Sequence, residues 1–166
     1  GLTSPVNAQE EEEMAPELHL EMIGTPEQIY NQGCRAYGKQ KYDEATLYFE
    51  HTAYTTEESS LKLKSLNNMG NSQYRNAQQL LATSAAEAHS IILQSISSFA
   101  TVRSLNPKYL KASLNLEAAR VTAVAILKQL EEEDQENPLQ KLVQEAIDKL
   151  KELIKRQETL FNYTTN

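Results

Sequence analysis

Apolar residues recur at helical spacing from Thr25 almost to the end of this chain, and this pattern constrains the fold more than any other feature. No segment shows the sustained two-residue alternation of a half-buried strand. Capping residues followed by proline, or by a glutamine or glutamate three positions later, mark expected helix starts at Thr25-Pro26, Thr55 with Glu58, Ser84 with Glu87, Asn106-Pro107 and Asn137-Pro138. A further helix is expected to open at Tyr42. The sequence therefore predicts an all-α fold of six helices.

Composition narrows the class further. The 166 residues are enough for one domain with appendages, and five glycines and five prolines are few for a β-sandwich or barrel. The single cysteine, Cys34, excludes an internal disulfide and a cysteine-based metal site. Acidic residues supply most of the net charge of −7 within residues 1–24, which we expect to form a disordered acidic tail. The nearly neutral remainder lacks the basic surface that nucleic acid binding requires.

Two stretches of the chain resemble each other. Residues 30–37 align with residues 67–74, with glycine matching glycine and tyrosine matching the tyrosine four positions later. The first stretch is followed at residues 41–45 by Lys-Tyr-Asp-Glu-Ala. These residue types at these offsets resemble the tetratricopeptide repeat (TPR), which is a pair of antiparallel helices that stacks on the next pair. The resemblance implies a TPR-like helical domain of about two repeats over residues 25–134.

The TPR resemblance assigns structural roles within each pair. Gly33 is the small residue where the first helix touches the second, Ala45 is its counterpart, and Tyr42 fills the turn between them. The full set of repeat positions is Gly33, Tyr42, Ala45, Phe49, Gly70, Phe99 and Pro107. The second unit is longer than the family's pattern, so residues 75–83 are interpreted as a prolonged first helix plus an insertion.

A narrower resemblance involves residues 113–120 and 150–160. Both are similar to segments of the TPR proteins of bacterial Bat (aerotolerance) operons. That resemblance implies an exported or membrane-anchored protein that scaffolds partners with von Willebrand A domains. Residues 4–9 have the small, neutral character of a signal peptide's end, so we expect a periplasmic or membrane-associated place in the bacterial envelope. An ordinary disordered N-terminus is the alternative, and any membrane association would need a signal or anchor outside this sequence.

No catalytic or metal-binding pattern is evident in the sequence. His19, His51 and His89 have no second ligand at metal-binding spacing. Cys34 falls on the helix face that lines the groove in TPR modules, without a histidine base nearby. Phosphate-binding glycine loops and nucleophilic serine motifs do not occur. We therefore expect neither an enzyme nor a bound cofactor.

The TPR resemblance implies a groove that binds a protein partner, formed by the first helix of each pair. The expected lining residues are Tyr30, Cys34, Tyr37, Asn67, Asn71, Tyr74, Arg75 and Lys111. Tyrosine and arginine suit such a surface because they supply large contact area at low entropic cost. One TPR subclass holds C-terminal carboxylates with a clamp of five residues. Only two of these five positions, Asn68 and Lys111, match here. This low number of matches argues against that specificity. The alternative is that the tyrosines fill space beneath the C-terminal helices.

Residues 137–163 are expected to form a long helix with one regular apolar row. The row steps by four and three residues through Leu139, Val143, Ala146, Leu150, Leu153, Gln157 and Leu160. The connection to the preceding helix is short, which favours an antiparallel cap on that helix. The expected contact residues there are Ala123, Ile126, Leu127 and Leu130.

These observations predict a non-catalytic adaptor whose groove binds a protein partner, either a peptide or a folded domain. We expect a monomer rather than a dimer. The alternative is a structural self-assembly module that dimerises through the C-terminal helix, with Gln157 setting the register. A third possibility is a carrier of a lipid or small molecule between the last two helices.

Overall fold

The computed structural model of this chain describes residues 20–136 and 138–164. Those residues form six helices and no strand, which confirms the all-α prediction. The helices are α1 (Pro26–Gly38), α2 (Tyr42–Thr55), α3 (Ser59–Leu80), α4 (Ala85–Leu105), α5 (Leu110–Glu136) and α6 (Pro138–Thr164). The expected acidic tail lies outside the described residues, except for residues 20–24.

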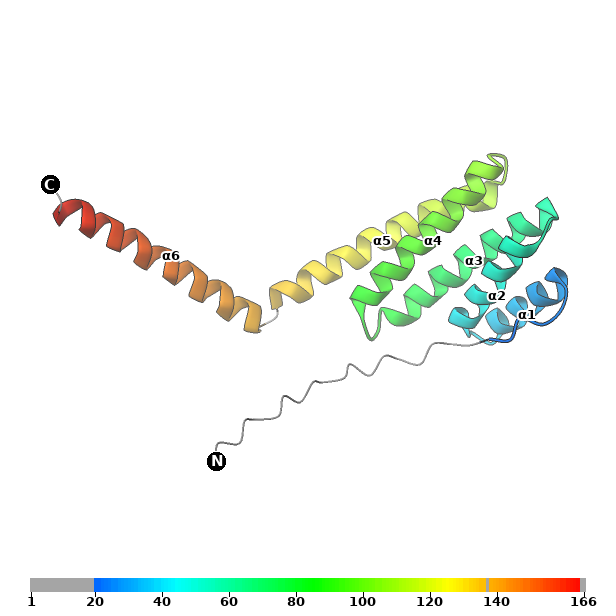
Figure 1. Cartoon of the computed structure of the whole chain (residues 1–166), viewed down its shortest axis with the longest axis horizontal. Helices are drawn as coiled ribbons and strands as arrows, with labels where there is room; N and C mark the ends of the chain where they lie inside the picture. Colours follow the sequence, from blue (N-terminus) through cyan, green and yellow to red (C-terminus); the bar gives the residue numbers. More distant parts are fainter. Residues whose placement is uncertain (1–19, 137, 165–166) are drawn as a thin grey trace, which may run out of the picture.

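Helices α1 to α5 form one stack in which each helix packs against the helices next to it in sequence (Figure 1). Lesser contacts join α1 to α3 and α3 to α5, so these three helices line one side of the stack. None of the helices in the described part of the chain is both long enough and apolar enough to cross a bilayer. The stack is therefore a row of helical hairpins with two kinds of surface, one lined by α1, α3 and α5 and the other by α2 and α4.

Two of the expected caps are present. The hydroxyl of Thr25 accepts a hydrogen bond from the backbone N–H of Gln28 at 3.3 Å, while the Gln28 side chain accepts one from the Thr25 N–H at 2.9 Å. The hydroxyl of Ser84 accepts a bond from the Glu87 N–H at 3.2 Å. Each bond satisfies a donor that would otherwise be unpaired at a helix start.

Two helix boundaries differ from the prediction. Thr55 ends α2 instead of capping α3, because the hydroxyl of Thr56 accepts the Glu58 N–H and closes the turn before Ser59. Helix α5 begins at Leu110, because the Asn106 side chain accepts the Lys108 N–H and forms a turn around Pro107. Helix α5 runs through its acidic end to Glu136, where side-chain pairs four residues apart, such as Lys128 with Glu132, support the last turns.

The core repeats one contact in two places. A Cβ atom added to Gly33 would stand 2.8 Å from the ring of Phe49, and one added to Gly70 would stand 2.7 Å from the ring of Phe99. Both rings are buried. In the second pair the hydroxyl of Ser95 also donates to the backbone oxygen of Gly70 at 2.8 Å. The two helix pairs thus share one close approach, although α3 and α4 are much longer than α1 and α2.

The remaining repeat positions have definite places in the stack. Ala45 is fully buried between α1 and α2, and Tyr42 is buried with its ring edge-on to Tyr37, their centroids 5.1 Å apart. Pro107 is exposed in the turn between α4 and α5. The expected insertion around residues 75–83 is absorbed by a lengthened α3, which ends at Leu80, and by a short turn before Ala85.

Helix α6 does not cap α5 in this structure, contrary to the expected packing. Its residues from Pro138 to Asn162 are all exposed, and among the helices it contacts only α5, from whose end it leads away (Figure 1). Three of the four residues expected beneath it, Ala123, Ile126 and Leu130, pack instead with residues of α3 and α4. The expected contact surface on α5 is therefore already used within the stack.

Candidate functional site

A groove lies on the side of the stack formed by α1, α3 and α5. It encloses about 430 Å³ and is lined by Tyr30, Lys64, Asn67, Asn68, Asn71, Tyr109, Lys111, Leu114 and Asn115. A smaller hollow of about 190 Å³ adjoins it, lined by Cys34, Tyr37, Phe49, Asn68 and Asn71. The two share Asn68 and Asn71, so we describe them together as the asparagine groove.

Helical spacing explains why these residues meet. Lys64, Asn68 and Asn71 are three or four residues apart and therefore project from one face of α3. Tyr30, Cys34 and Tyr37 are spaced in the same way on α1. On α5, Lys111 and Asn115 lie one turn apart at the start of the helix. The groove is thus built mainly by one face from each of α1, α3 and α5, and Phe49 of α2 also lines its smaller hollow.

Hydrogen bonds between side chains hold these helices together across the groove. The Asn68 amide donates to the Tyr30 hydroxyl at 2.9 Å, joining α3 to α1. The Asn115 amide donates to the Asn71 side-chain oxygen at 3.1 Å, joining α5 to α3. An asparagine has two donors and an acceptor oxygen, so each of these amides keeps hydrogen-bonding capacity beyond the bond described. The groove floor is therefore both cross-linked and polar.

Asn67 is the unusual member of the groove. Its side chain is only 5% exposed, and its side-chain oxygen has no hydrogen-bond partner within the described residues. Leaving such an acceptor buried and unsatisfied costs about 1–3 kcal/mol. If the Asn67 amide rotates toward the groove, an N–H donor of a bound ligand would recover part of that energy.

The charge of the groove is positive. Lys64 and Lys111 are both exposed at its edge, and none of its lining residues is acidic. Burial, followed by the effect of the neighbouring Cys34, raises the pKa of Tyr30 above its ordinary value of 10.0. Burial likewise raises the pKa of Tyr37. Both phenols are neutral near pH 7, so the two lysines set the sign of the groove's charge.

The structure brings six of the eight expected groove residues together in the asparagine groove: Tyr30, Cys34, Tyr37, Asn67, Asn71 and Lys111. The other two lie elsewhere. Tyr74 packs with the second core cluster, and its hydroxyl lies 3.0 Å from that of Thr122 on α5. Arg75 stacks over the ring of Tyr42 at 5.5 Å, and its contact with Tyr42 raises its pKa.

Sequence reasoning missed some lining residues. Asn68 is interpreted only as a clamp position in the sequence analysis, and Lys64, Tyr109, Leu114 and Asn115 are not assigned to the groove there. Lys64 could have been found, because it lies one turn before Asn68 on the same face of α3. Tyr109 and Leu114 could not, because their positions depend on α5 beginning at Leu110.

The other chemistry-bearing side chains are scattered. Among residues 20–136 and 138–164, no group of three or more histidine, cysteine, aspartate or glutamate side chains could hold a metal ion. The Cys34 thiol is exposed. His51 and His89 lie on different helices, and His19 lies outside the described residues.

Comparisons with protein-family models, with curated proteins and with solved structures found no match for this chain. Its likeness to TPR and Bat-operon proteins therefore rests on the residues described above.

Proposed function

We propose that this protein is a non-catalytic adaptor that holds an extended segment of a protein partner in the asparagine groove. The observation that carries the proposal is Asn67, which lines the polar groove and whose buried side-chain oxygen has no hydrogen-bond partner within the described residues. A peptide backbone N–H is a donor of the kind this oxygen lacks. The neighbouring amides of Asn68, Asn71 and Asn115 offer further bonds to a peptide's carbonyl and N–H groups.

The charge of the groove indicates what kind of segment fits. Lys64 and Lys111 flank the asparagines, so acidic residues in the partner would gain favourable interactions at both edges. Rim charges of this kind act chiefly on the association rate and are weakened by salt. The proposed ligand is therefore an extended, acidic protein segment.

The setting of this adaptor is proposed from the resemblance to Bat-operon proteins. In that setting the protein belongs to an exported or envelope-associated bacterial complex, and its partner carries a von Willebrand A-type domain. The groove would engage an exposed acidic segment of that partner.

The test is a binding measurement with a peptide array of extended sequences that differ in charge. Acidic peptides should bind, and their affinity should fall as salt rises from 50 mM to 500 mM. Asn67→Leu and Asn71→Ala should weaken binding, and Lys64→Glu together with Lys111→Glu should abolish the preference for acidic sequences. The matched controls are Asn31→Ala and Lys39→Glu, which alter exposed residues outside the groove.

Binding that is lost equally in the groove variants and the controls would contradict the proposal. A preference for basic peptides would contradict it as well.

A further inference from the structure

Two exposed apolar surfaces remain on the chain after the stack has formed. One is the α6 row, which we define as Val143, Ala146, Leu150, Leu153, Gln157 and Leu160. The other is the outer row of α5, which we define as Leu110, Leu114, Glu117, Val121 and Val124. The apolar members of the outer row are about 70% exposed, at 73% for Leu110, 72% for Leu114, 70% for Val121 and 69% for Val124.

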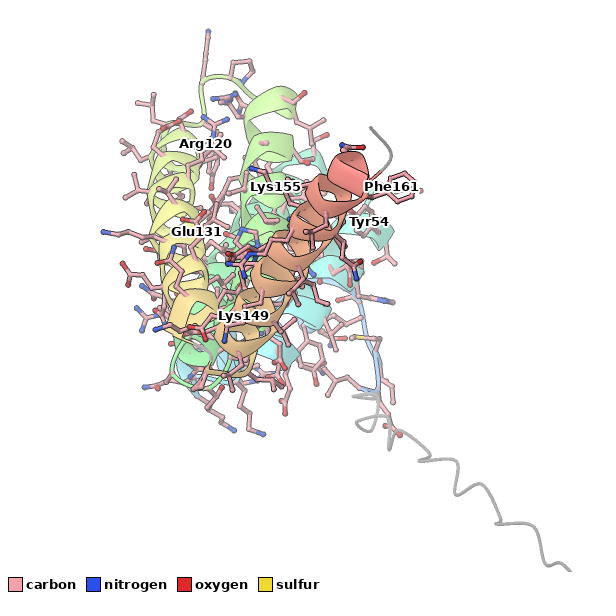
Figure 2. The ribbon with its side chains drawn as sticks, turned by 90° about the vertical axis from the view of Figure 1, so that its left-hand side faces the viewer. Tyr54, Arg120, Glu131, Lys149, Lys155 and Phe161 are labelled. Carbon is pink, nitrogen blue, oxygen red and sulfur yellow. The ribbon has the colours of Figure 1, made fainter. Side chains whose placement is uncertain are left out.

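The outer row of α5 lies opposite the face that α5 buries in the stack. Ala112, Leu116 and Ala119 are fully buried against α4 and its neighbours, whereas the outer row faces away from them. In Figure 2, Arg120 and Glu131 mark the length of α5 at one edge of the stack. A stack of helical hairpins normally ends with a polar outer face. The apolar outer row of α5 therefore calls for a covering element.

The two rows have matching spacing when the helices run antiparallel. If Leu150 is placed opposite Val124, the three- and four-residue steps bring Leu153 opposite Val121 and Leu160 opposite Leu114. The only polar residue of the α6 row, Gln157, then falls opposite Glu117, the only polar residue of the outer row of α5. A polar residue in an apolar seam is best tolerated opposite another polar residue, and such pairs fix the register of paired helices.

The edges of the two rows also match in this register. Ile147 and Ile154, which widen the α6 row on one side, fall beside Ala125 and Ala118 on α5. All four residues are exposed in the structure, and large residues beside small ones interdigitate well. Arg156 falls next to Glu117, so the polar pair gains a charged partner. The part of the α6 row from Leu150 to Leu160 therefore finds a surface of matching shape, whereas Val143 and Ala146 fall opposite Glu131 and Lys128.

We propose that a second copy of this chain supplies the covering element, with the α6 row of each chain packed antiparallel on the outer row of α5 of the other. The link between the helices favours this arrangement over a fold-back within one chain. Helix α5 ends at Glu136 and α6 begins at Pro138, whereas antiparallel helix pairs are joined by about 2–5 residues. A link this short favours exchange of the element between two chains.

The size of the buried surface fits a stable dimer. Removing one leucine or valine side chain from water buries roughly 60–120 Å² at about 25 cal/mol per Å². In this register the two-fold arrangement buries Leu150, Leu153 and Leu160 against Val124, Val121 and Leu114 twice. With Ile147 and Ile154 added, the buried area is of the order of the roughly 1,200 Å² that a stable interface needs. The interface is self-complementary, as a two-fold dimer requires. This proposal departs from the sequence-based expectation of a monomer, which rested on a cap within one chain.

Sedimentation equilibrium of the full chain at several concentrations tests the proposal. We expect a species of twice 18.7 kDa at micromolar concentration. Leu150→Asp and, separately, Val121→Asp should each raise the dissociation constant at least roughly tenfold, because each removes a buried apolar contact twice per dimer. The matched control is Glu145→Ala, on the opposite side of α6. Unchanged helical circular dichroism in each variant would show that the chain still folds.

A cross-linking measurement fixes the register. In a Cys34→Ser background, a chain with Val124→Cys is mixed with a differently tagged chain with Leu150→Cys and then oxidised. We expect a disulfide-linked heterodimer, and none when Glu145→Cys replaces Leu150→Cys. A monomer at every concentration would overturn the proposal in favour of a fold-back or an isolated α6. A dimer that survives Val121→Asp but not Leu150→Asp would overturn it in favour of pairing between two α6 helices.

Discussion

Helices α5 and α6 have the same length of 27 residues, but the structure uses them differently. Helix α5 buries one face in the stack with residues such as Leu116 and Ile126, whereas α6 is exposed along its described length. Yet α6 has the more regular apolar row. The comparison shows that amphipathic spacing specifies which face of a helix must be covered but not which element covers it.

Helix α4 makes the same point from the other direction. It packs between α3 and α5, so apolar residues are needed on two of its sides. Ile92 and Phe99 are both buried, although the spacing of apolar residues around α4 marks no single face as clearly as in α6. A helix in this protein is buried to the extent that other helices pack against it. A helix at the end of the stack therefore has fewer packing partners and stays more exposed.

The largest difference between the stack and α6 should appear when a large side chain is removed from each. Phe99→Ala should lower the free energy of unfolding by about 3–5 kcal/mol, because it empties the space that Gly70 leaves for the ring. Leu153→Ala should change it by less than about 0.5 kcal/mol at dilutions where the chain is monomeric. Urea unfolding at nanomolar concentration measures both. Equal losses would mean that α6 is held to the stack within one chain.

Overpacking should separate buried from exposed alanines. Ala45→Leu should cost about 1–3 kcal/mol, because Ala45 is fully buried where α1 meets α2. Ala86→Leu, at an exposed position in the first turn of α4, should have little effect. The free energies come from chemical denaturation of both variants. If Ala45→Leu is as stable as the parent, the close packing of the first helix pair is contradicted.

A smaller effect is expected at the start of the stack. Thr25→Ala removes one partner of the capping box of α1 and should cost about 1 kcal/mol. Thr101→Ala provides the control, because Thr101 is exposed and bonds only within its own helix. Amide exchange of the first turn of α1 should accelerate in Thr25→Ala alone. Unchanged exchange there would show that the cap does not hold the helix end.

The smallest effect concerns pH. Burial raises the pKa values of Tyr30 and Tyr37 above 10.0, so the stack favours their neutral forms. Their contribution to stability is complete below pH 10 and is lost as the pH rises through the raised pKa values. The unfolding midpoint should therefore fall above pH 10, and less so in Tyr37→Phe. Helix α6 carries no tyrosine within residues 138–162. We therefore expect the helical circular dichroism that α6 contributes to stay constant above pH 10, while the unfolding midpoint of the stack falls.

The sequence was sufficient to predict the helices because their spacing and caps are local properties. Most of the groove residues, such as Tyr30, Asn71 and Lys111, were expected from the TPR resemblance, which places them on the first helix of each pair. The sequence misplaced Tyr74, because the bond of that residue to Thr122 depends on how α3 packs against α5. It misplaced α6 for a related reason, since a short acidic connection does not reveal whether two helices fold back or continue outward.

Leu114 belongs to both surfaces, because it lines the asparagine groove and also lies in the outer row of α5. Two equilibria that share a residue are thermodynamically linked, and the linkage is reciprocal. If a partner segment and a second chain both touch Leu114, each changes the affinity of the other by the same factor. The affinity for the partner segment would then depend on the concentration of the protein itself, because partner binding and dimerisation both involve Leu114.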